Sequence, residues 1–277
     1  MRLFLYLTCM LYCSVMWACE LIDVFSAESL RSHAPVVVGH RGGAVVEGIP
    51  ENSLQAMRLA AKRGYSMVEI DVRATLDGVP VASHDSEMEK HVGVAGSIEE
   101  ATVAELSELH YLEGEEFPIL TVEESLAEAS RLQLGVMLDI KSGQENEVFP
   151  QQIDEFLQRY GLTRATLTIS RHENTRRYLA NSVMQRVSSE DFERVKRGEQ
   201  LDLSGQVWFN WPRYISNDEV ARLQSMGAIV VPSINVFHYP EATHLERAKA
   251  DIERMREAGV DAYQIDAPYD QFVMTGE

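Results

Sequence analysis

Short hydrophobic runs recur along the chain from Pro35 onward, and amphipathic segments with helical spacing separate them. Most of the runs are continuous rather than alternating, which is typical of parallel strands covered by helices on both faces. No linker rich in Pro, Gly or Ser and no repeat of fixed period divides this part of the chain. The pattern therefore predicts one α/β domain. The candidate strands are residues 36–38, 67–72, 79–83, 135–140, 166–169, 183–187, 207–209, 229–234 and 262–265.

The alternation of strand and helix predicts a parallel sheet, and the length suits a single TIM-type (β/α)8 barrel, a fold of about 250 residues. We place the barrel domain at residues 35–272. Nine runs then compete for eight places, and we omit 207–209, one of the two shortest. Helix starts are marked by Thr121 with Glu124 and by Ser216 with Glu219, pairs that fit a capping box.

Residues 86–135 form the longest interval without a strong strand signal. The pattern predicts helices near 97–109 and 122–132, and Gly227 suits a left-handed helix end later in the chain. The interval is too short for a separate domain, so we expect it to cover one side of the barrel mouth.

Residues 1–18 hold one charge, Arg2, followed by an apolar run that is typical of an export signal. The Ala18-Cys19 junction resembles a bacterial lipoprotein signal, in which Cys19 would carry the lipid, although Trp17 departs from the small residue usual there. A soluble form cut nearby and a retained N-terminal anchor are the alternatives. We expect export to the bacterial periplasm or cell surface, with membrane attachment through Cys19 or an uncleaved segment.

The formal net charge is −18, from 43 acidic and 25 basic residues. Such a surface repels nucleic acid, which we exclude as a partner. Solubility alone is the simplest explanation of the charge, because acidic surfaces are common. An anionic substrate would then need a local group of basic side chains.

Acidic residues stand at the ends of two predicted strands. Glu69 and Asp71 are two apart, so their side chains point the same way while Ile70 faces the other layer. Asp139 lies at the matching end of a further strand, and the carboxyl ends of all barrel strands open on one face. Three clustered carboxylates favour a divalent cation, Mg²⁺ or Ca²⁺ rather than zinc. Pairing of each carboxylate with Lys or Arg is the simpler alternative.

Histidine and basic side chains also end predicted strands. His40 and His84 would lie across the barrel mouth, where one can donate a proton while the other accepts one. Arg41 and Lys141 supply the positive charge that a phosphodiester requires. For Arg41, an ion pair with a carboxylate of the rim is the alternative. The substrate we expect is a small phosphodiester.

These motifs, in this order and at these spacings, resemble the glycerophosphodiester phosphodiesterase family. The resemblance extends through residues 117–124 to the last predicted strand, and matching positions become fewer after Lys141. The motifs are His40-Arg41-Gly42, Pro50-Glu51-Asn52-Ser53, Glu69-Ile70-Asp71, Asp77-Gly78, His84-Asp85, Asp139-Ile140-Lys141 and Ile265-Asp266-Ala267-Pro268.

The resemblance implies a TIM barrel that hydrolyses a glycerophosphodiester to an alcohol and glycerol 3-phosphate. It implies that a metal ion orients a glycerol hydroxyl for attack at phosphorus, with a cyclic phosphate then opened by water. The implied roles are an acid/base pair, His40 and His84; metal ligands Glu69, Asp71 and Asp139; phosphate-binding residues Arg41 and Lys141; and supporting residues Glu51 and Asn52.

The chain departs from the family pattern at several positions. Asp139 stands where Glu is usual and is one methylene shorter, so we expect the ion to shift toward the other ligands or to bind Asp139 through water. Ser53 replaces Thr, Ile265 replaces a hydroxyl residue, and 229–235 lacks a tryptophan. The departures after Lys141 concern substrate choice rather than bond chemistry.

Two further functions remain open. A phospholipase D-like enzyme acting on lysophospholipid or sphingolipid would use the same ion and histidines with a larger apolar mouth. A catalytically silent surface binding protein would keep the barrel without turnover. Late aromatic residues bear on the first of these because they could line a pocket for an alcohol or acyl chain, although packing beneath the rim is the favoured interpretation. They are Trp208, Trp211, Tyr214, Phe237 and Tyr239.

Overall fold

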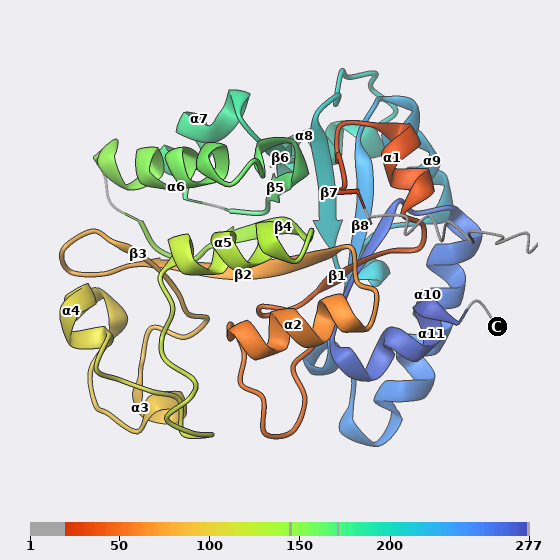
Figure 1. Ribbon diagram of the computed structural model, residues 1–277. Coiled ribbons are helices and arrows are strands. Elements are labelled where there is room, and N and C mark those ends of the chain that lie inside the picture. Colours follow the sequence, from red (N-terminus) through yellow and green to blue (C-terminus); the bar gives the residue numbers. More distant parts are fainter. Residues whose placement is uncertain (1–19, 144–145, 171, 276–277) are drawn as a thin grey trace, which may run out of the picture.

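Eight parallel strands close into a ring in the computed structural model, which describes residues 20–143, 146–170 and 172–275. The ring closes because β1 pairs with both β2 and β9, and helices surround it (Figure 1). The predicted (β/α)8 barrel is therefore confirmed. In ring order the strands are β1 (Val36–Gly39), β2 (Met67–Ala74), β4 (Gly135–Ile140), β5 (Thr166–Thr168), β6 (Met184–Arg186), β7 (Gln206–Asn210), β8 (Ile229–Ile234) and β9 (Ala262–Ile265).

The ninth strand, β3 (Pro80–Ala82), lies outside the ring and runs antiparallel to β2. Only five residues join it to β2, and so short a turn permits an antiparallel return but no crossover to a parallel neighbour. Omitting 207–209 was therefore wrong, as was the expectation that every strand is parallel. Val207 pairs with Arg186 on one side and Ile229 on the other, which gives β7 its place in the barrel.

A helix follows each ring strand before the next begins or the chain ends. The predicted capping boxes are present at Thr121 and Ser216, and Gly227 has a φ of +90° just past α9. In chain order the outer helices are α2 (Leu54–Lys62), α5 (Val122–Arg131), α6 (Val148–Arg159), α7 (Glu173–Tyr178), α8 (Ser189–Lys196), α9 (Asn217–Ser225), α10 (His244–Ala258) and α11 (Asp270–Met274), with α1 (Ala27–Ser32) before β1. The 3-10 turns are η1 (Ile98–Glu100), η2 (Thr163–Ala165), η3 (Leu179–Asn181), η4 (Pro212–Tyr214), η5 (Val236–His238), η6 (Glu241–Thr243) and η7 (Ala267–Tyr269).

The segment between β2 and α5 forms an excursion with a small core of its own. Its short helices α3 (Glu89–Val92) and α4 (Val103–Leu106) stand apart at the lower left of Figure 1. The helix predicted over 97–109 was wrong in extent, because the chain is extended at Ala101 and Thr102 caps a new helix with its side chain. The core residues are Val81, Met88, Ile98, Leu106, Tyr111, Phe117 and Ile119.

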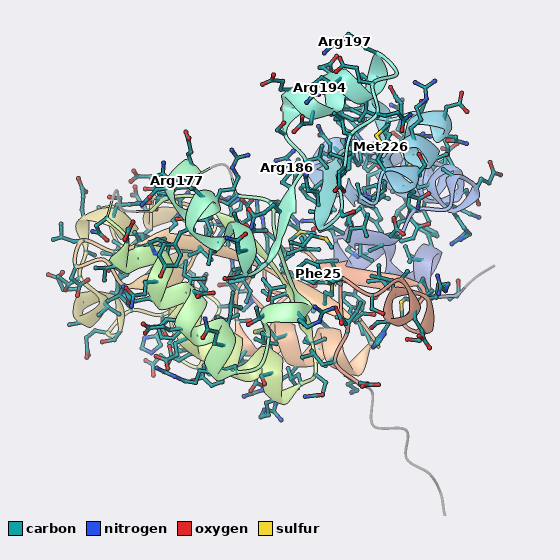
Figure 2. All side chains as sticks on the ribbon, turned by 90° about the horizontal axis from the view of Figure 1, so that it is seen from above. Phe25, Arg177, Arg186, Arg194, Arg197 and Met226 are labelled. Atoms are coloured by element: carbon teal, nitrogen blue, oxygen red, sulfur yellow. The ribbon has the colours of Figure 1, made fainter. Side chains whose placement is uncertain are left out.

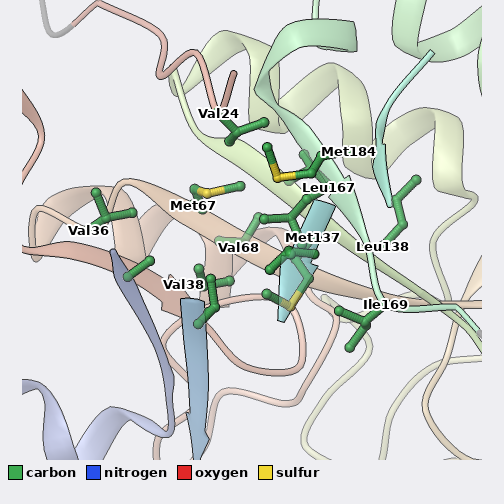
Figure 3. Packing of buried hydrophobic residues seen from close by; sticks show 14 of the residues in the cluster. Val24, Val36, Val38, Met67, Val68, Met137, Leu138, Leu167, Ile169 and Met184 are labelled. Atoms are coloured by element: carbon green, nitrogen blue, oxygen red, sulfur yellow. The ribbon is translucent and has the colours of Figure 1, made fainter. Parts of the chain in front are cut away.

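The barrel interior is filled by side chains that the strand register places in layers. Met67 pairs with Val38, Met137 with Leu167, and Leu167 with Met184. Paired residues on parallel strands point to the same side, so these side chains share the interior, and Figure 3 shows several of them packed together. The chain before β1 takes part in this packing, since Ile22 and Val24 are almost fully buried and Val24 lies beside Met67 and Met184 (Figure 3).

The same register carries upward to the mouth of the barrel. Residues two and four positions beyond an inward residue also point inward. From Met67 this rule reaches Glu69 and Asp71, and from Met184 it reaches Arg186. Polar side chains from different strands thus converge at the carboxyl ends, the location at which barrel enzymes carry their sites.

The proposed export segment, residues 1–18 with Cys19, lies outside the described residues. Among the helices of the described ranges, none is long and apolar enough to cross a membrane.

Candidate active site

A tight turn from His40 to Gly43 follows β1 and forms one wall of the site. Arg41 has a φ of +52° and Gly42 a φ of +86°. The backbone N–H of Gly42 donates to the Glu69 carbonyl at 2.6 Å, and that of Asn52 donates to the Arg41 carbonyl at 2.7 Å. A Cβ at position 42 would lie 2.5 Å from the Cα of Asn52, so only glycine allows this close approach.

Three carboxylates meet beside this turn, as the sequence predicts. Glu69, Asp71 and Asp139 each offer an oxygen, and these oxygens lie within 4.8 Å of one another. Asp71 and Asp139 are direct register partners on β2 and β4. Burial, followed by the charges of Asp71 and Asp139, raises the pKa of Glu69 well above its usual range. The cluster is thus costly to ionise without added positive charge.

Lys141 supplies part of that charge. Its ammonium lies 2.5 Å from Asp139 Oδ2 and 3.1 Å from Asp71 Oδ1. Burial acts to raise the pKa of Asp71, but Lys141, His84, the hydrogen bond from Asn52 and His40 together outweigh it and hold this pKa below its ordinary value. Asn52 also contacts Asp71, since its side-chain amide donates to Oδ2 at 3.0 Å.

The acidic cluster has the donor set of a site for a hard divalent cation. It offers oxygen atoms alone, and two of its carboxylates, Glu69 and Asp71, are almost completely buried. Asp71 Oδ1 accepts no hydrogen bond from the described residues, although Lys141 lies nearby. A buried carboxylate oxygen that accepts no hydrogen bond can serve as a ligand for a cation. The residues present therefore fit a divalent ion.

His40 is held in place by Asp266, which directly follows the last strand, β9. Its Nδ1 lies 2.6 Å from Asp266 Oδ1, and the other Asp266 oxygen accepts from the Val236 backbone N–H at 2.5 Å. Ionised Asp266 can only accept, so Nδ1 carries the proton and Nε2 is the nitrogen available for chemistry. His40 Nε2 lies 3.9 Å from Glu69, and the Phe237 ring packs 6.0 Å from the imidazole.

His84, like His40, has a carboxylate next to its Nδ1. Its Nδ1 lies 2.7 Å from Asp85 Oδ1, while its Nε2 lies 3.2 Å from Arg41 Nη2. Because Arg41 can only donate, His84 Nε2 must accept, which makes the ring neutral with its proton on Nδ1. His91, in the excursion after β2, contacts the second Asp85 oxygen at 3.0 Å, so this segment borders the mouth as expected. Arg73 fixes the backbone of His84 by donating to its carbonyl at 2.8 and 3.0 Å.

The guanidinium of Arg41 contacts both His84 and Glu51. Its Nη1 donates to Glu51 Oε2 at 2.6 Å, which is the ion pair weighed as the alternative for Arg41. Because Arg41 also reaches His84, its guanidinium lies at the mouth rather than away from it. Glu51 is therefore a hydrogen-bond acceptor for Arg41 at the mouth.

The other half of the mouth holds a cavity of about 400 Å³. Trp211 and Phe237 line it as the sequence allowed, whereas Trp208 packs against Phe192 in the core and Tyr239 is buried. The lining residues are Asp139, Ile140, Lys141, Ile169, Arg186, Phe209, Asn210, Trp211, Ser233, Phe237 and His238.

Sequence reasoning missed Asp266, Arg186 and His238 as site residues. For Asp266 the signal was present, since it directly follows the last predicted strand, 262–265, much as His40 follows the first. Arg186 lay inside the predicted strand 183–187, but its inward direction follows only from the pairing of Met184 with Leu167. His238 is brought to the mouth by η5, a turn that the pattern of apolar residues does not predict.

Sequence comparison finds relatives whose names agree with one another. A model of the glycerophosphoryl diester phosphodiesterase family matches residues 40–269. Glycerophosphodiester phosphodiesterase 1 of Mus musculus is 37% identical over 112 residues, 38% of this chain and 33% of the relative. The Homo sapiens protein of that name is 33% identical over 133 residues, 44% of this chain and 39% of the relative. The chain thus matches less than half of these curated relatives.

Solved structures share the fold. A glycerophosphoryl diester phosphodiesterase from Parabacteroides distasonis has a TM-score of 0.67 at 20% identity, covering 92% of this chain and 93% of that chain. A phosphodiesterase from Oleispira antarctica, in complex with the product sn-glycerol-3-phosphate, has a TM-score of 0.64 at 24% identity, covering 88% and 98%. At such identities the likeness concerns the fold.

Proposed function

The chain belongs to the glycerophosphoryl diester phosphodiesterase family, and we propose that it hydrolyses glycerophosphodiesters to an alcohol and glycerol 3-phosphate. The observation that carries the proposal is the convergence of a carboxylate cluster with two histidines, each having a carboxylate on Nδ1. Binding alone needs no such pair of proton-transfer groups. The Oleispira antarctica enzyme of similar fold, solved with sn-glycerol-3-phosphate, supports this product class.

Glu69, Asp71 and Asp139 would hold a divalent cation, Mg²⁺ or Ca²⁺. Their oxygen donors and the raised pKa of Glu69 support this assignment. A bound cation would neutralise negative charge on the phosphoryl oxygens. Asp139 is held by Lys141, so the short side chain that replaces the usual Glu is directed toward the cluster.

His84 is the proposed general base and His40 the proposed general acid. In the free protein His84 Nε2 accepts from Arg41, so this nitrogen already holds the lone pair that a base needs. Asp266 stabilises a protonated His40, whose Nε2–H would deliver a proton to the oxygen of the leaving alcohol. Arg41 and Lys141 would bind the phosphate oxygens, and Arg41 would exchange His84 for substrate as it does so.

Release of glycerol 3-phosphate tests this function directly. Purified protein is incubated with glycerophosphoethanolamine before and after chelation, and again after Mg²⁺ or Ca²⁺ is returned. We expect activity that is lost with the chelator and recovered with one of the ions. The D71N variant should need a higher ion concentration for half-maximal activity. Turnover that is insensitive to chelation would remove the metal assignment, and no turnover with any ion would remove the proposed reaction.

One observation favours a second candidate, a phospholipase D-like reaction on lysophospholipid or sphingolipid. Val236 and Phe237 are exposed by 39% and 67% at the mouth beside His40, where an acyl chain could lie. Assays that offer lysophosphatidylethanolamine in place of glycerophosphoethanolamine separate the two functions. Turnover of neither would favour a silent binding protein.

We also propose export to the bacterial periplasm or cell surface, on the apolar character of residues 1–18. Mass measurement of the mature N-terminus tests this, because lipidation adds mass to Cys19 while simple cleavage does not. An intact Met1 with no added lipid in material from cells would leave a retained segment as the remaining explanation.

A further inference from the structure

Glu99 lies in η1, the 3-10 turn of the excursion that packs against β2. Its neighbour Ile98 is buried in the small core of the excursion, which fixes the backbone of this turn. The Ile98 N–H donates to the Ser86 carbonyl at 2.9 Å, and this bond joins η1 to the loop that follows His84. Glu99 is thereby placed where the excursion meets the barrel mouth, and its side chain is 31% exposed.

The Glu99 carboxylate accepts hydrogen bonds from three separate segments. Oε1 accepts from Arg73 Nη1 at 2.7 Å and from Ser142 Oγ at 2.8 Å, and Oε2 accepts from Ser86 Oγ at 2.6 Å. The donors belong to β2, to the loop after β4 and to the loop after His84. Burial acts to raise the pKa of Glu99, but its hydrogen bonds outweigh burial and lower this pKa, so the carboxylate is ionised at neutral pH.

Arg73 connects Glu99 with His84. Its Nη1 donates to Glu99, while its Nε and Nη2 donate to the His84 carbonyl at 3.0 and 2.8 Å. A guanidinium is planar and rigid, so a partner that fixes one nitrogen also fixes the direction of the other two. The Glu99 carboxylate therefore sets the direction in which Arg73 holds the backbone of His84.

His84 depends on this support more than the ends of the ring strands do. β3 ends two residues before His84, and β3 itself lies outside the ring. The end of β4 is held by the barrel, because the Lys141 N–H donates to a carbonyl of β2 at 2.8 Å. The hydrogen bond from Ser142 to Glu99 thus adds to a strand end that is already fixed.

We propose that Glu99 is a positioning residue for the reaction, which holds the general base His84 in place through Arg73. This inference rests on the proposed function, since it takes His84 as the base. A displacement of about 1 Å at a catalytic group can lower turnover about 10²-fold, even when the substituted residue lies far from the chemistry. The excursion thereby contributes to catalysis as well as bordering the mouth.

Substitution of Glu99 tests the proposal. E99A removes both acceptor oxygens, and we expect kcat with glycerophosphoethanolamine to fall about 10- to 10²-fold while KM stays within about threefold. E99Q keeps an acceptor for Arg73, and its amide can donate to the Ser86 hydroxyl, so kcat should stay within about threefold of wild type. A fall in E99Q as large as that in E99A would assign the effect to the charge and overturn the positioning role.

A double-mutant cycle tests whether Glu99 acts through His84. Once the imidazole is removed in H84A, adding E99A should cause no further loss, and the residual kcat of the two should agree within about twofold. An equal fractional fall in both backgrounds would reduce Glu99 to structural support and overturn the proposal. Thermal melting reports whether each variant is folded. R73Q breaks the same connection from the other side and takes the place of E99A in the cycle if E99A does not fold.

Glu199 provides the control. It also accepts hydrogen bonds from arginine side chains, from Arg194 and from Arg197, each at 2.9 Å. These two arginines lie at the edge of the molecule far from the excursion in the view of Figure 2. E199A removes the same kind of ion pair, and its kcat should stay within about twofold of wild type. A fall equal to that in E99A would assign the effect to the general loss of a carboxylate and overturn the role of Glu99.

The outcomes separate the inference from the function on which it rests. Unchanged kcat in folded E99A overturns the positioning role while the proposed function stands. Failure of the wild-type protein to release glycerol 3-phosphate from glycerophosphoethanolamine overturns the function and the positioning role together.

Discussion

The two halves of the barrel mouth are built differently. At the ends of β1, β2 and β4, polar and charged side chains are hydrogen-bonded to one another: Asp71 accepts from Asn52, and Arg41 donates to Glu51. At the ends of β6 to β8, the side chains are larger and stacked, as in the pair Trp211 and His238. The first half is a hydrogen-bonded network, and the second is a lined cavity.

The two halves differ because buried charges and cavity walls have different physical requirements. A buried carboxylate tolerates few changes around it, because an unpaired charge is costly to bury. The walls of a cavity need only the right volume and a few polar contacts. The family pattern is complete over His40 to Asp85 apart from the mild change at Ser53, and on β4 Asp139 still supplies a carboxylate in place of Glu. In the second half the pattern is altered in 229–235 and at Ile265. We therefore expect large effects on turnover in the first half and effects on substrate choice in the second.

Substitution of His84 should give the largest effect. H84A removes the proposed base, and kcat should fall about 10²- to 10⁴-fold, the usual contribution of general acid–base catalysis. H91A is the matched control, because His91 also contacts Asp85 but lies in the excursion beyond the acidic cluster. Its kcat should change less than about tenfold. Wild-type turnover in H84A would remove the acid/base assignment.

Substitution of Asp266 tests whether this residue, which follows the last strand, contributes to catalysis through His40. D266N keeps the shape of the side chain but removes the charge behind His40, so kcat should fall about 10- to 10²-fold. The alkaline limb of the pH–rate profile should move to lower pH, since an imidazolium is less stable beside an amide than beside a carboxylate. A lower rate with an unmoved profile would reduce Asp266 to a structural role.

Substitution of Phe237 tests the second half by itself. Its ring is 67% exposed and packs against His40 from the cavity side. F237A should raise KM about three- to tenfold and leave kcat within about threefold, because the ring contacts substrate equally before and during the reaction. Steady-state kinetics with glycerophosphoethanolamine measures both constants. A loss of turnover as large as the one expected for H84A would show that chemistry extends into this half.

We expect the smallest effect from substitution of Glu128. This residue lies on α5, away from the acidic cluster, so its loss should change stability and not turnover. Hydrogen bonds from Arg131 and Arg58 lower its pKa to about 2 on the outside of the barrel. The ionised pair therefore stabilises the fold above the ordinary pKa of Glu, and this contribution is lost as the pH falls from about 4.5 toward 2.

E128Q should lower the free energy of unfolding at pH 7 by about 1 kcal/mol or less, since both arginine partners of Glu128 are exposed and ion pairs open to solvent contribute little. The difference from wild type should vanish near pH 2, and turnover at pH 7 should be unchanged. Urea unfolding at the two pH values measures this. A constant difference across the pH range would mean that the charge of Glu128 is not its source.

Several elements of the fold could be predicted from local pattern because their causes are local. The continuous apolar run 135–140 is β4, and Thr121 caps α5 through contacts within one helical turn. The errors arose where partners lie far apart in the chain. The apolar run of β7, residues 207–209, is short. β7 is nevertheless a barrel strand because β6 and β8 supply its hydrogen bonds. β3 has a stronger apolar pattern, but among the strands of the described residues it pairs with β2 alone.

The sequence by itself determined the barrel, the acidic cluster and the two histidines, because strand periodicity directs Glu69 and Asp71 to one face and parallel strands open at one end. Only the tertiary structure decided which side chains contact the histidines and which line the cavity next to the acidic cluster. Asp266 reaches His40 across 226 positions of chain, and Arg186 faces the cavity through a register set by β5. Such contacts depend on ring closure and strand register, and these are fixed by the packing of the whole barrel rather than by any single segment.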